Sequence, residues 1–119
     1  MKQVKSVVWP LLVVLLAACT QKDEIPKGTI SEEKMGQIMT DIHLIEARVS
    51  RLSIASIDST TLVSERLKRD VFKKHKIDTA AYNQSYRFYS MHPEYLERIY
   101  EKVVKNLEKR VKKDDVKGL

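Results

Sequence analysis

The sequence contains a single cysteine, Cys19, among its 119 residues. A disulfide within the chain is therefore impossible, and stability outside the reducing cytoplasm must come from packing. Glycine and proline are also scarce, with three residues of each. Few glycines disfavour tight β-hairpins and the glycine-rich loops that hold phosphate groups. No apolar run reaches the roughly 20 residues of a transmembrane helix, so we expect no membrane-spanning segment.

The longest apolar run covers residues 7–18 and is interrupted only by Pro10. It follows two lysines and ends in the segment Leu-Ala-Ala-Cys at residues 16–19. A basic start, an apolar stretch of about 7–15 residues and small residues at the cut describe a secretory signal peptide. A cysteine directly after the cut is typical of a bacterial lipoprotein. Residues 1–18 are therefore predicted to be removed, and Cys19 to be lipidated.

Lipid on Cys19 would attach the protein to a membrane that it does not cross. One acyl chain gives only marginal binding, whereas two or more hold a protein stably, at ~0.8 kcal/mol per buried CH₂. We expect a cell-envelope protein of the outer membrane, because Thr20 rather than aspartate follows the cysteine. The segment Lys-Asp-Glu at residues 22–24 resembles a surface-export signal of Bacteroidota lipoproteins. The alternative is an ordinary solvated linker.

Without the signal peptide, 101 residues remain, enough for one domain. Since Lys2 and Lys5 leave with the signal, 20 Lys and Arg stand against 16 Asp and Glu, a formal charge of +4. Such a mixed charge suits solubility better than binding to nucleic acid. Residues 19–30 are predicted to form the lipidated cysteine and a flexible tether. A helical domain is expected at 31–113 and a frayed tail at 114–119.

Four amphipathic helices are predicted in this domain, since apolar residues recur at steps of three and four. Ser31 and Asp78 are expected to cap the first and third helices, and Ser59 or Asp58 the second. Short connections and the lack of a strand pattern predict an all-α fold, a small bundle behind the signal peptide and tether. In chain order, the helices are expected at residues 31 to about 54, about 60 to 76, 79 to the junction at 92–93, and 93 to about 113.

The spacing within each helix predicts which side chains are buried. In the second helix, Phe72 falls beside the main apolar stripe. In the third, Phe88 lies off a face formed by Tyr82, Tyr86 and Tyr89. Phe88 and Tyr95, at the edge of the fourth stripe, are therefore candidates for exposed contact with a protein partner. The stripe expected to be buried in the first helix comprises Met35, Ile38, Met39, Ile42, Ile45, Val49 and Leu52.

Several segments resemble the domain-of-unknown-function family 4296, whose members look like small Bacteroidota lipoproteins. The resemblance covers about residues 26–108. Its most specific parts are Asp-x-His-x-x-Glu at 41–46 and His-Pro-Glu at 92–94. It implies an all-helical envelope protein and supplies no activity. The segments that carry the resemblance are residues 30–35, 40–47, 85–89, 92–94 and 99–100.

The candidates for chemistry are Asp41, His43 and Glu46. His43 and Glu46 lie three residues apart and are neighbours on one helix, with Glu46 and Asp41 at opposite edges of the apolar stripe. A metal site would need a further ligand such as His75 or His92, because zinc takes three or four. Only two ligands show a suggestive spacing, so we expect no metal.

The alternative role of Asp41 and Glu46 is structural. Buried acids are normally hydrogen-bonded or paired. We therefore expect both acids to accept hydrogen bonds from side chains of the third helix. The expected partners are Tyr86, Arg87 and Tyr89.

The sequence predicts a lipid-anchored helical module for binding or assembly. No nucleophile elbow, phosphate loop or zincin motif is present, so an enzyme is not expected. Nucleic acid is not expected as a partner. The expected partners are membrane lipid and an envelope protein, with no cofactor besides lipid on Cys19. Two alternatives are a metal-dependent or hydrolytic enzyme that uses Asp41, His43 and Glu46, and a chaperone-like accessory of an outer-membrane complex.

Overall fold

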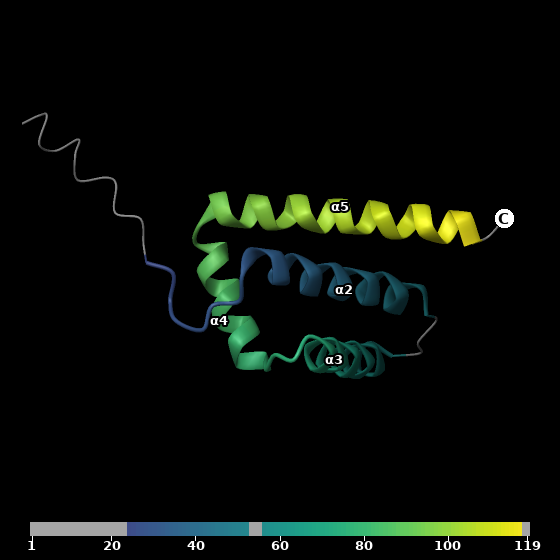
Figure 1. Cartoon of the computed structure of the whole chain (residues 1–119). Helices are drawn as coiled ribbons and strands as arrows, with labels where there is room; N and C mark the ends of the chain where they lie inside the picture. The colour runs from purple at the N-terminus through teal and green to yellow at the C-terminus, as the bar shows by residue number, and fades with distance from the viewer. Residues whose placement is uncertain (1–23, 53–55, 118–119) are drawn as a thin grey trace, which may run out of the picture.

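The computed structural model describes residues 24–52 and 56–117, which form four helices without a strand (Figure 1). This confirms the predicted all-α class. Cys19 and the predicted signal peptide lie outside the described residues. Among the described helices, none combines the length and apolar character needed to span a bilayer. The helices are α2 (Glu32–Arg51), α3 (Ile57–Lys74), α4 (Thr79–Ser90) and α5 (Pro93–Lys117).

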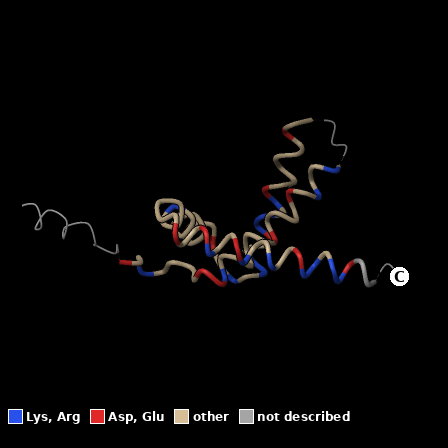
Figure 2. Tube along the Cα trace, turned by 90° about the horizontal axis from the view of Figure 1, so that it is seen from above, with Lys and Arg blue, Asp and Glu red and all other residues tan. Residues whose placement is uncertain are grey.

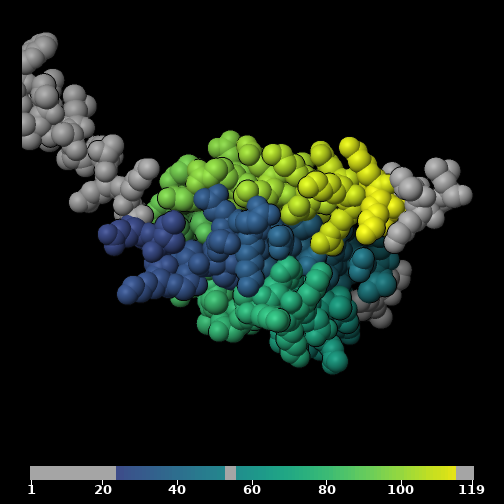
Figure 3. Space-filling model, viewed as in Figure 1, coloured from purple at the N-terminus to yellow at the C-terminus, as the bar shows by residue number. Residues whose placement is uncertain are grey.

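The other helices are arranged around α2. It packs against both α5 and α3, while α4 lies across one end of the bundle and contacts α5 (Figure 1). Seen from above, the C-terminal end of α5 separates from the α2–α3 pair, and both signs of charge are interspersed along the helices (Figure 2). The space-filling view shows α2 as a layer between α5 and α3 (Figure 3). Helix α2 is thus the central helix, with α3 and α5 packed on two of its sides.

The beginnings of α2 and α4 are where the sequence predicts them. The Ser31 side chain accepts a hydrogen bond from the backbone N–H of Lys34, and Asp78 accepts one from Ala81 at 2.6 Å. Each cap satisfies a backbone donor that the first turn leaves without a partner. These short side chains therefore set both helix starts, as expected.

α3 begins three residues before its predicted start. Its cap is Ser56, whose hydroxyl accepts from the backbone N–H of Ser59 at 3.2 Å, and neither Asp58 nor Ser59 is the cap. Ile57 is 85 % exposed, so the first turn carries no amphipathic signal. A search for an apolar stripe therefore misses this turn.

α3 also ends two residues earlier than predicted. Lys76 adopts a left-handed φ of 54°. The Lys76 N–H donates to the carbonyl of Lys73 and the Ile77 N–H to that of Phe72, both at 3.0 Å. This is the Schellman pattern, usually formed around a glycine, and it satisfies the last carbonyls of a helix. Because this position holds a lysine and not the usual glycine, nothing in the sequence marked the end of the helix.

α5 starts at Pro93 as predicted but continues to Lys117, beyond the expected end at residue 113. The tail predicted to fray therefore begins as helix. Residues 114–117 contain neither glycine nor proline, and the first such residue is Gly118. Nothing in the local sequence opposes the extra turn.

The core is formed mainly by the predicted stripe of α2. Its last member, Leu52, is 54 % exposed, so that part of the prediction is wrong; it follows the end of the helix. Phe72, predicted beside the α3 stripe, is buried in the core. At Gly36 an added Cβ would lie 3.0 Å from Cβ of Lys102, so this glycine allows α2 and α5 to approach closely. Buried apolar side chains of the core are Ile30, Met35, Ile38, Met39, Ile42, Val71, Phe72, Phe88, Tyr89, Ile99 and Val103.

The end of the predicted tether is bound to α4. The Ile30 N–H donates to Oγ of Ser85 at 2.9 Å, and the Tyr89 hydroxyl donates to the Ile30 carbonyl at 2.6 Å. Ile30 is buried, so it belongs to the domain and not to a flexible tether. Hydrogen bonds between residues more than fifty positions apart hold it there, which local composition cannot reveal.

Tyr89→Phe tests this attachment. We expect the free energy of unfolding to fall by about 1–2 kcal/mol, because the buried Ile30 carbonyl loses its donor. Urea titration followed by circular dichroism measures the change. Tyr86→Phe, which removes a more exposed hydroxyl, is the control and should cost less. Equal losses in the two variants would contradict the attachment.

Candidate functional site

The three candidate residues of the segment 41–46 do not form one cluster. Asp41 is buried and faces α3 and α5, whereas the side chains of His43 and Glu46 are 41 % and 46 % exposed. The two groups occupy different sides of α2, as the helical spacing predicts for Asp41 and Glu46. The segment therefore contributes to two sites with different surroundings.

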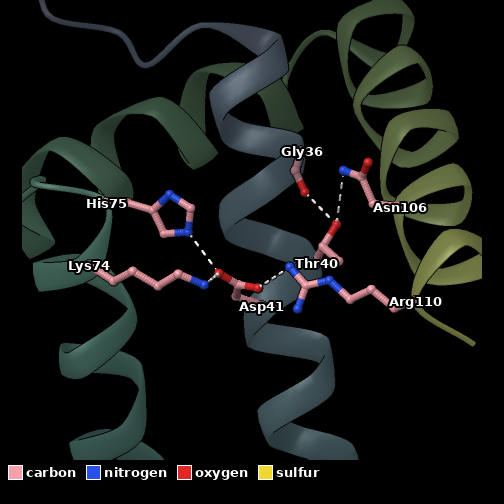
Figure 4. Close-up of polar contacts among 7 residues, drawn as sticks. All are labelled: Gly36, Thr40, Asp41, Lys74, His75, Asn106 and Arg110. Carbon is pink, nitrogen blue, oxygen red and sulfur yellow. Dashed lines mark hydrogen bonds and ion pairs between the residues drawn. The ribbon is translucent and has the colours of Figure 1, made fainter. Parts of the chain in front are cut away.

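Asp41 joins three helices. Its Oδ2 accepts hydrogen bonds from Lys74 Nζ at 2.9 Å and His75 Nε2 at 2.8 Å, both from the C-terminal end of α3 (Figure 4). Its Oδ1 accepts from Arg110 of α5 at 2.6 Å. The prediction that side chains of α4 bind Asp41 is wrong. Helix α4 crosses the bundle at the N-terminal end of α2, whereas Asp41 lies near the middle of α2.

The surroundings of Asp41 keep it ionised. Burial alone would raise the pKa of this carboxyl, but hydrogen bonds from His75, Lys74 and Arg110 outweigh burial and lower the pKa to about 2. Both carboxylate oxygens have donors at neutral pH, so Asp41 acts as a structural anchor between helices.

Thr40 provides a second polar contact between α2 and α5, beside Asp41 (Figure 4). Its hydroxyl donates to the Gly36 carbonyl at 2.7 Å and accepts from Asn106 at 3.4 Å. Thr40 is fully buried. Sequence reasoning missed Thr40 and Asn106, because a lone threonine or asparagine on a helix carries no pattern.

His43 and Glu46 border a hollow of about 160 Å³, which we call the tyrosine hollow. All four helices contribute to it. Its floor is apolar, with side chains from α2 and α3, and tyrosines from α4 and α5 form its walls. The lining residues are Met39, Ile42, His43, Glu46, Lys68, Phe72, Tyr82, Tyr86 and Tyr100.

The polar edge of the tyrosine hollow is a short row of three side chains, with Glu46 between His43 and Lys68. Glu46 lies 3.5 Å from Nδ1 of His43 and 3.5 Å from Nζ of Lys68. The His43 ring is 6.3 Å from the ring of Tyr100. Glu46 thus has Lys68 of α3 as its partner, and not the expected arginine of α4. One acid and one lysine leave this edge close to neutral.

The tyrosine walls are partly buried, and burial affects the pKa of two of them. The rings of Tyr82 and Tyr86 stack at 6.0 Å, and Phe72 lies 4.9 Å from Tyr82. Burial raises the pKa of Tyr82 to about 12, and burial together with Tyr86 also raises the pKa of Tyr100. The hydroxyls of Tyr82 and Tyr100 therefore carry their protons at neutral pH. Of the three tyrosines that share a face of α4, only Tyr89 is buried in the core.

Phe88 is not an exposed contact residue. It is 5 % exposed and packs in the core with its ring 4.3 Å from that of His92 and 5.8 Å from that of Tyr95. The crossing of α4 over the end of the bundle buries two of its faces, which the periodicity of α4 alone does not predict. Tyr95 is half-buried against the core, and the Arg98 guanidinium lies 4.7 Å above its ring.

The histidines considered as metal ligands lie apart. His75 binds Asp41 on another side of α2, and Nδ1 of His92 lies 2.6 Å from the Phe88 carbonyl oxygen. Neither joins His43 and Glu46. In the part of the chain that the structure describes, no group of three or more His, Cys, Asp or Glu could hold a metal ion.

Replacing both His43 and Glu46 with alanine should leave the fold intact. Their 3.5 Å pair is largely exposed, so we expect the free energy of unfolding to change by less than about 1 kcal/mol. Urea titration measures this. A loss of several kcal/mol would show that the pair is a structural element of the fold.

The fold defines a small all-helical domain with a central helix and a tyrosine-lined hollow. The model of the family described as Domain of unknown function (DUF4296) matches residues 26–113, so the chain belongs to this family. The predicted resemblance is confirmed. No curated protein and no solved structure matches the chain.

Proposed function

We propose that this protein is a lipid-anchored protein of the outer membrane that acts as a helical binding module, with the tyrosine hollow as its binding site. The observation that carries this proposal is the hollow itself, because an apolar floor and tyrosine walls meet at a solvent-facing opening. The segment Leu-Ala-Ala-Cys at residues 16–19 supports the anchor.

The lining of the hollow suits recognition of an apolar or aromatic group. Tyrosine is rigid and amphipathic, and it is enriched where proteins bind one another. A dry cavity of about 150 Å³ can hold a ring the size of benzene. The hollow, at about 160 Å³, therefore has room for one large side chain.

The enzyme alternative has weaker support. It requires Asp41, His43 and Glu46 to act together, yet Asp41 is buried and both its oxygens are bonded to cationic side chains. Such an acid is positioned to hold helices together and not to exchange protons with a substrate. The binding proposal rests on the hollow and requires no proton transfer by Asp41.

Cys19→Ala tests the anchor. We expect the wild-type chain from cells to lack residues 1–18, to carry acyl mass on Cys19 and to remain with membranes after a salt wash. The variant should carry no acyl mass and lose this membrane association. Mass spectrometry and membrane fractionation measure both. A native chain that retains Trp9 and lacks acyl mass would contradict the proposal.

Photo-crosslinking in cells tests the binding site. Benzoylphenylalanine at Tyr86 or Tyr100 should capture the same protein, because both residues line the hollow. At Lys73, an exposed position of α3 outside the hollow, it should not. Capture that is equal at all three positions, or absent from both hollow positions, would overturn the assignment of the hollow as the binding site.

A further inference from the structure

We infer that the partner of this protein presents a basic amphipathic helix, which lies along α5 and inserts one large apolar side chain into the tyrosine hollow. This inference rests on the proposed binding function and specifies the chemistry of the partner. It is carried by an exposed apolar stripe that begins at the hollow and by the acids beside that stripe.

The stripe consists of Tyr100, Val104 and Val111, which we call the α5 stripe. These residues are 39 %, 52 % and 60 % exposed. Their spacing of four and seven residues places them on one face of the helix. Tyr100 lines the hollow, so the stripe leads away from it for about 16 Å, given a rise of about 1.5 Å per residue. That length matches three turns of a helix lying alongside.

The fold leaves the α5 stripe uncovered. The buried face of α5 includes Ile99 and Val103, which pack in the core. Arg110 still reaches Asp41 of α2, and the C-terminal end of α5 then separates from the α2–α3 pair (Figure 2). The stripe is therefore apolar surface that no other described helix covers, and contiguous exposed apolar surface commonly marks an interaction site.

Acids border this stripe. Glu97, Glu101 and Glu108 lie three or four residues from members of the stripe and so occupy its edge. All three are exposed, and none has an ion-pair partner among the described residues. Like charges at Glu97 and Glu101 disfavour the isolated helix slightly. A cation from a partner would relieve this repulsion.

Charge complementarity then selects the partner. At the hollow, Lys68 already balances Glu46. Along α5, the charges next to the stripe are the three acids, whereas Lys105 and Lys112, one turn after Glu101 and Glu108, lie further round the helix. A helix whose apolar face covers the stripe would place its flanking residues beside these acids, and lysine or arginine fits there. In an antiparallel pair of α5 helices from two copies, the same acidic edges would face each other, which disfavours self-association through the stripe.

Two designed peptides of about 18 residues, five helical turns long, test the inference. Both carry the same leucine stripe with a central phenylalanine, and they differ only in flanking lysine or glutamate. The full mature chain is held in nanodiscs of zwitterionic lipid, with empty nanodiscs as the blank. Fluorescence anisotropy should show saturable binding of the lysine peptide, at least about tenfold tighter than the glutamate peptide.

The combined variant Glu97→Lys, Glu101→Lys and Glu108→Lys should invert this preference, because it reverses the charge of the edge without touching the core. A matched variant on the opposite face of α5, Lys109→Glu with Lys113→Glu, should retain the preference for lysine. Tyr100→Ala should weaken binding of the lysine peptide by about tenfold. Circular dichroism checks that each variant keeps its helices.

Absence of binding by either peptide, equal binding of the two, or a preference that charge reversal leaves unchanged would overturn the inference. So would a dimer, detected by sedimentation, that Val104→Asp dissociates. These outcomes leave the crosslinking test of the hollow unaffected, so failure of the inference is distinguishable from failure of the proposed function.

Discussion

Replacing Asp41 with asparagine is expected to lower the free energy of unfolding by about 2 kcal/mol at pH 7. The native carboxylate accepts hydrogen bonds from Lys74, His75 and Arg110, and these contacts hold α2 to α3 and α5. Asparagine keeps the shape but loses the charge and one acceptor. Urea titration at pH 7 measures the loss.

The pH dependence of this loss follows from the pKa of Asp41. The pKa is lowered from 3.8 to about 2 in the folded protein. The contribution of Asp41 is therefore fully present above pH 4 to 5 and disappears as the pH falls through about 2. The stability difference between wild type and Asp41→Asn should shrink across this window.

Asp70→Asn provides the matched control. Asp70 and Asp41 both line a groove between α2, α3 and α5. Asp70 is exposed, however, and forms no ion pair among the described residues. We expect it to change stability by less than about 0.5 kcal/mol. If the two variants lose equal stability, or if the Asp41→Asn difference is constant with pH, Asp41 is not the anchor described above.

Ile99→Ala should have the largest effect, a loss of about 3 kcal/mol in the free energy of unfolding. Ile99 is fully buried in α5, and its carbonyl lies near Gly36, where α2 and α5 approach each other closely. Truncation removes apolar contacts and leaves a cavity that two helices already in close contact cannot readily fill. Thermal and urea unfolding measure the change.

Val104→Ala is the control on the same helix. Val104 is 52 % exposed, so its truncation should cost less than about 0.5 kcal/mol, while the binding inference assigns it to the contact surface. A large loss of stability in Val104→Ala would show that the α5 stripe is covered within the fold. A small loss in Ile99→Ala would contradict the packing of α2 against α5.

Local signals in the sequence were sufficient for three of the four helix starts. Ser31, Asp78 and Pro93 mark starts through hydrogen bonding or ring geometry that depends on neighbouring residues only. The start of α3 was missed because the exposed Ile57 hides the first turn. Its stop was missed because Lys76 adopts a left-handed conformation that usually calls for glycine.

The candidate site was predictable in part. Spacing on α2 placed Asp41 and Glu46 on opposite edges of the apolar stripe, but it gave no information about which distant side chains meet them. Lys74 and Arg110 lie 33 and 69 residues beyond Asp41 along the chain. In the same way, spacing along one helix could not show that Tyr100 of α5 and Lys68 of α3 both line the hollow, because residues of four helices surround it.

The amino-acid sequence by itself determined the number of helices, three of their starts, the family and the prediction of a lipid anchor, because each depends on residues within a few positions of one another. Only the tertiary structure decided that Asp41 is an anchor, that Phe88 is buried and that the hollow opens beside an uncovered α5 stripe. The crossing of α4 and the divergence of α5 produce these features. Such angles depend on how whole side-chain surfaces pack, and no local pattern encodes them.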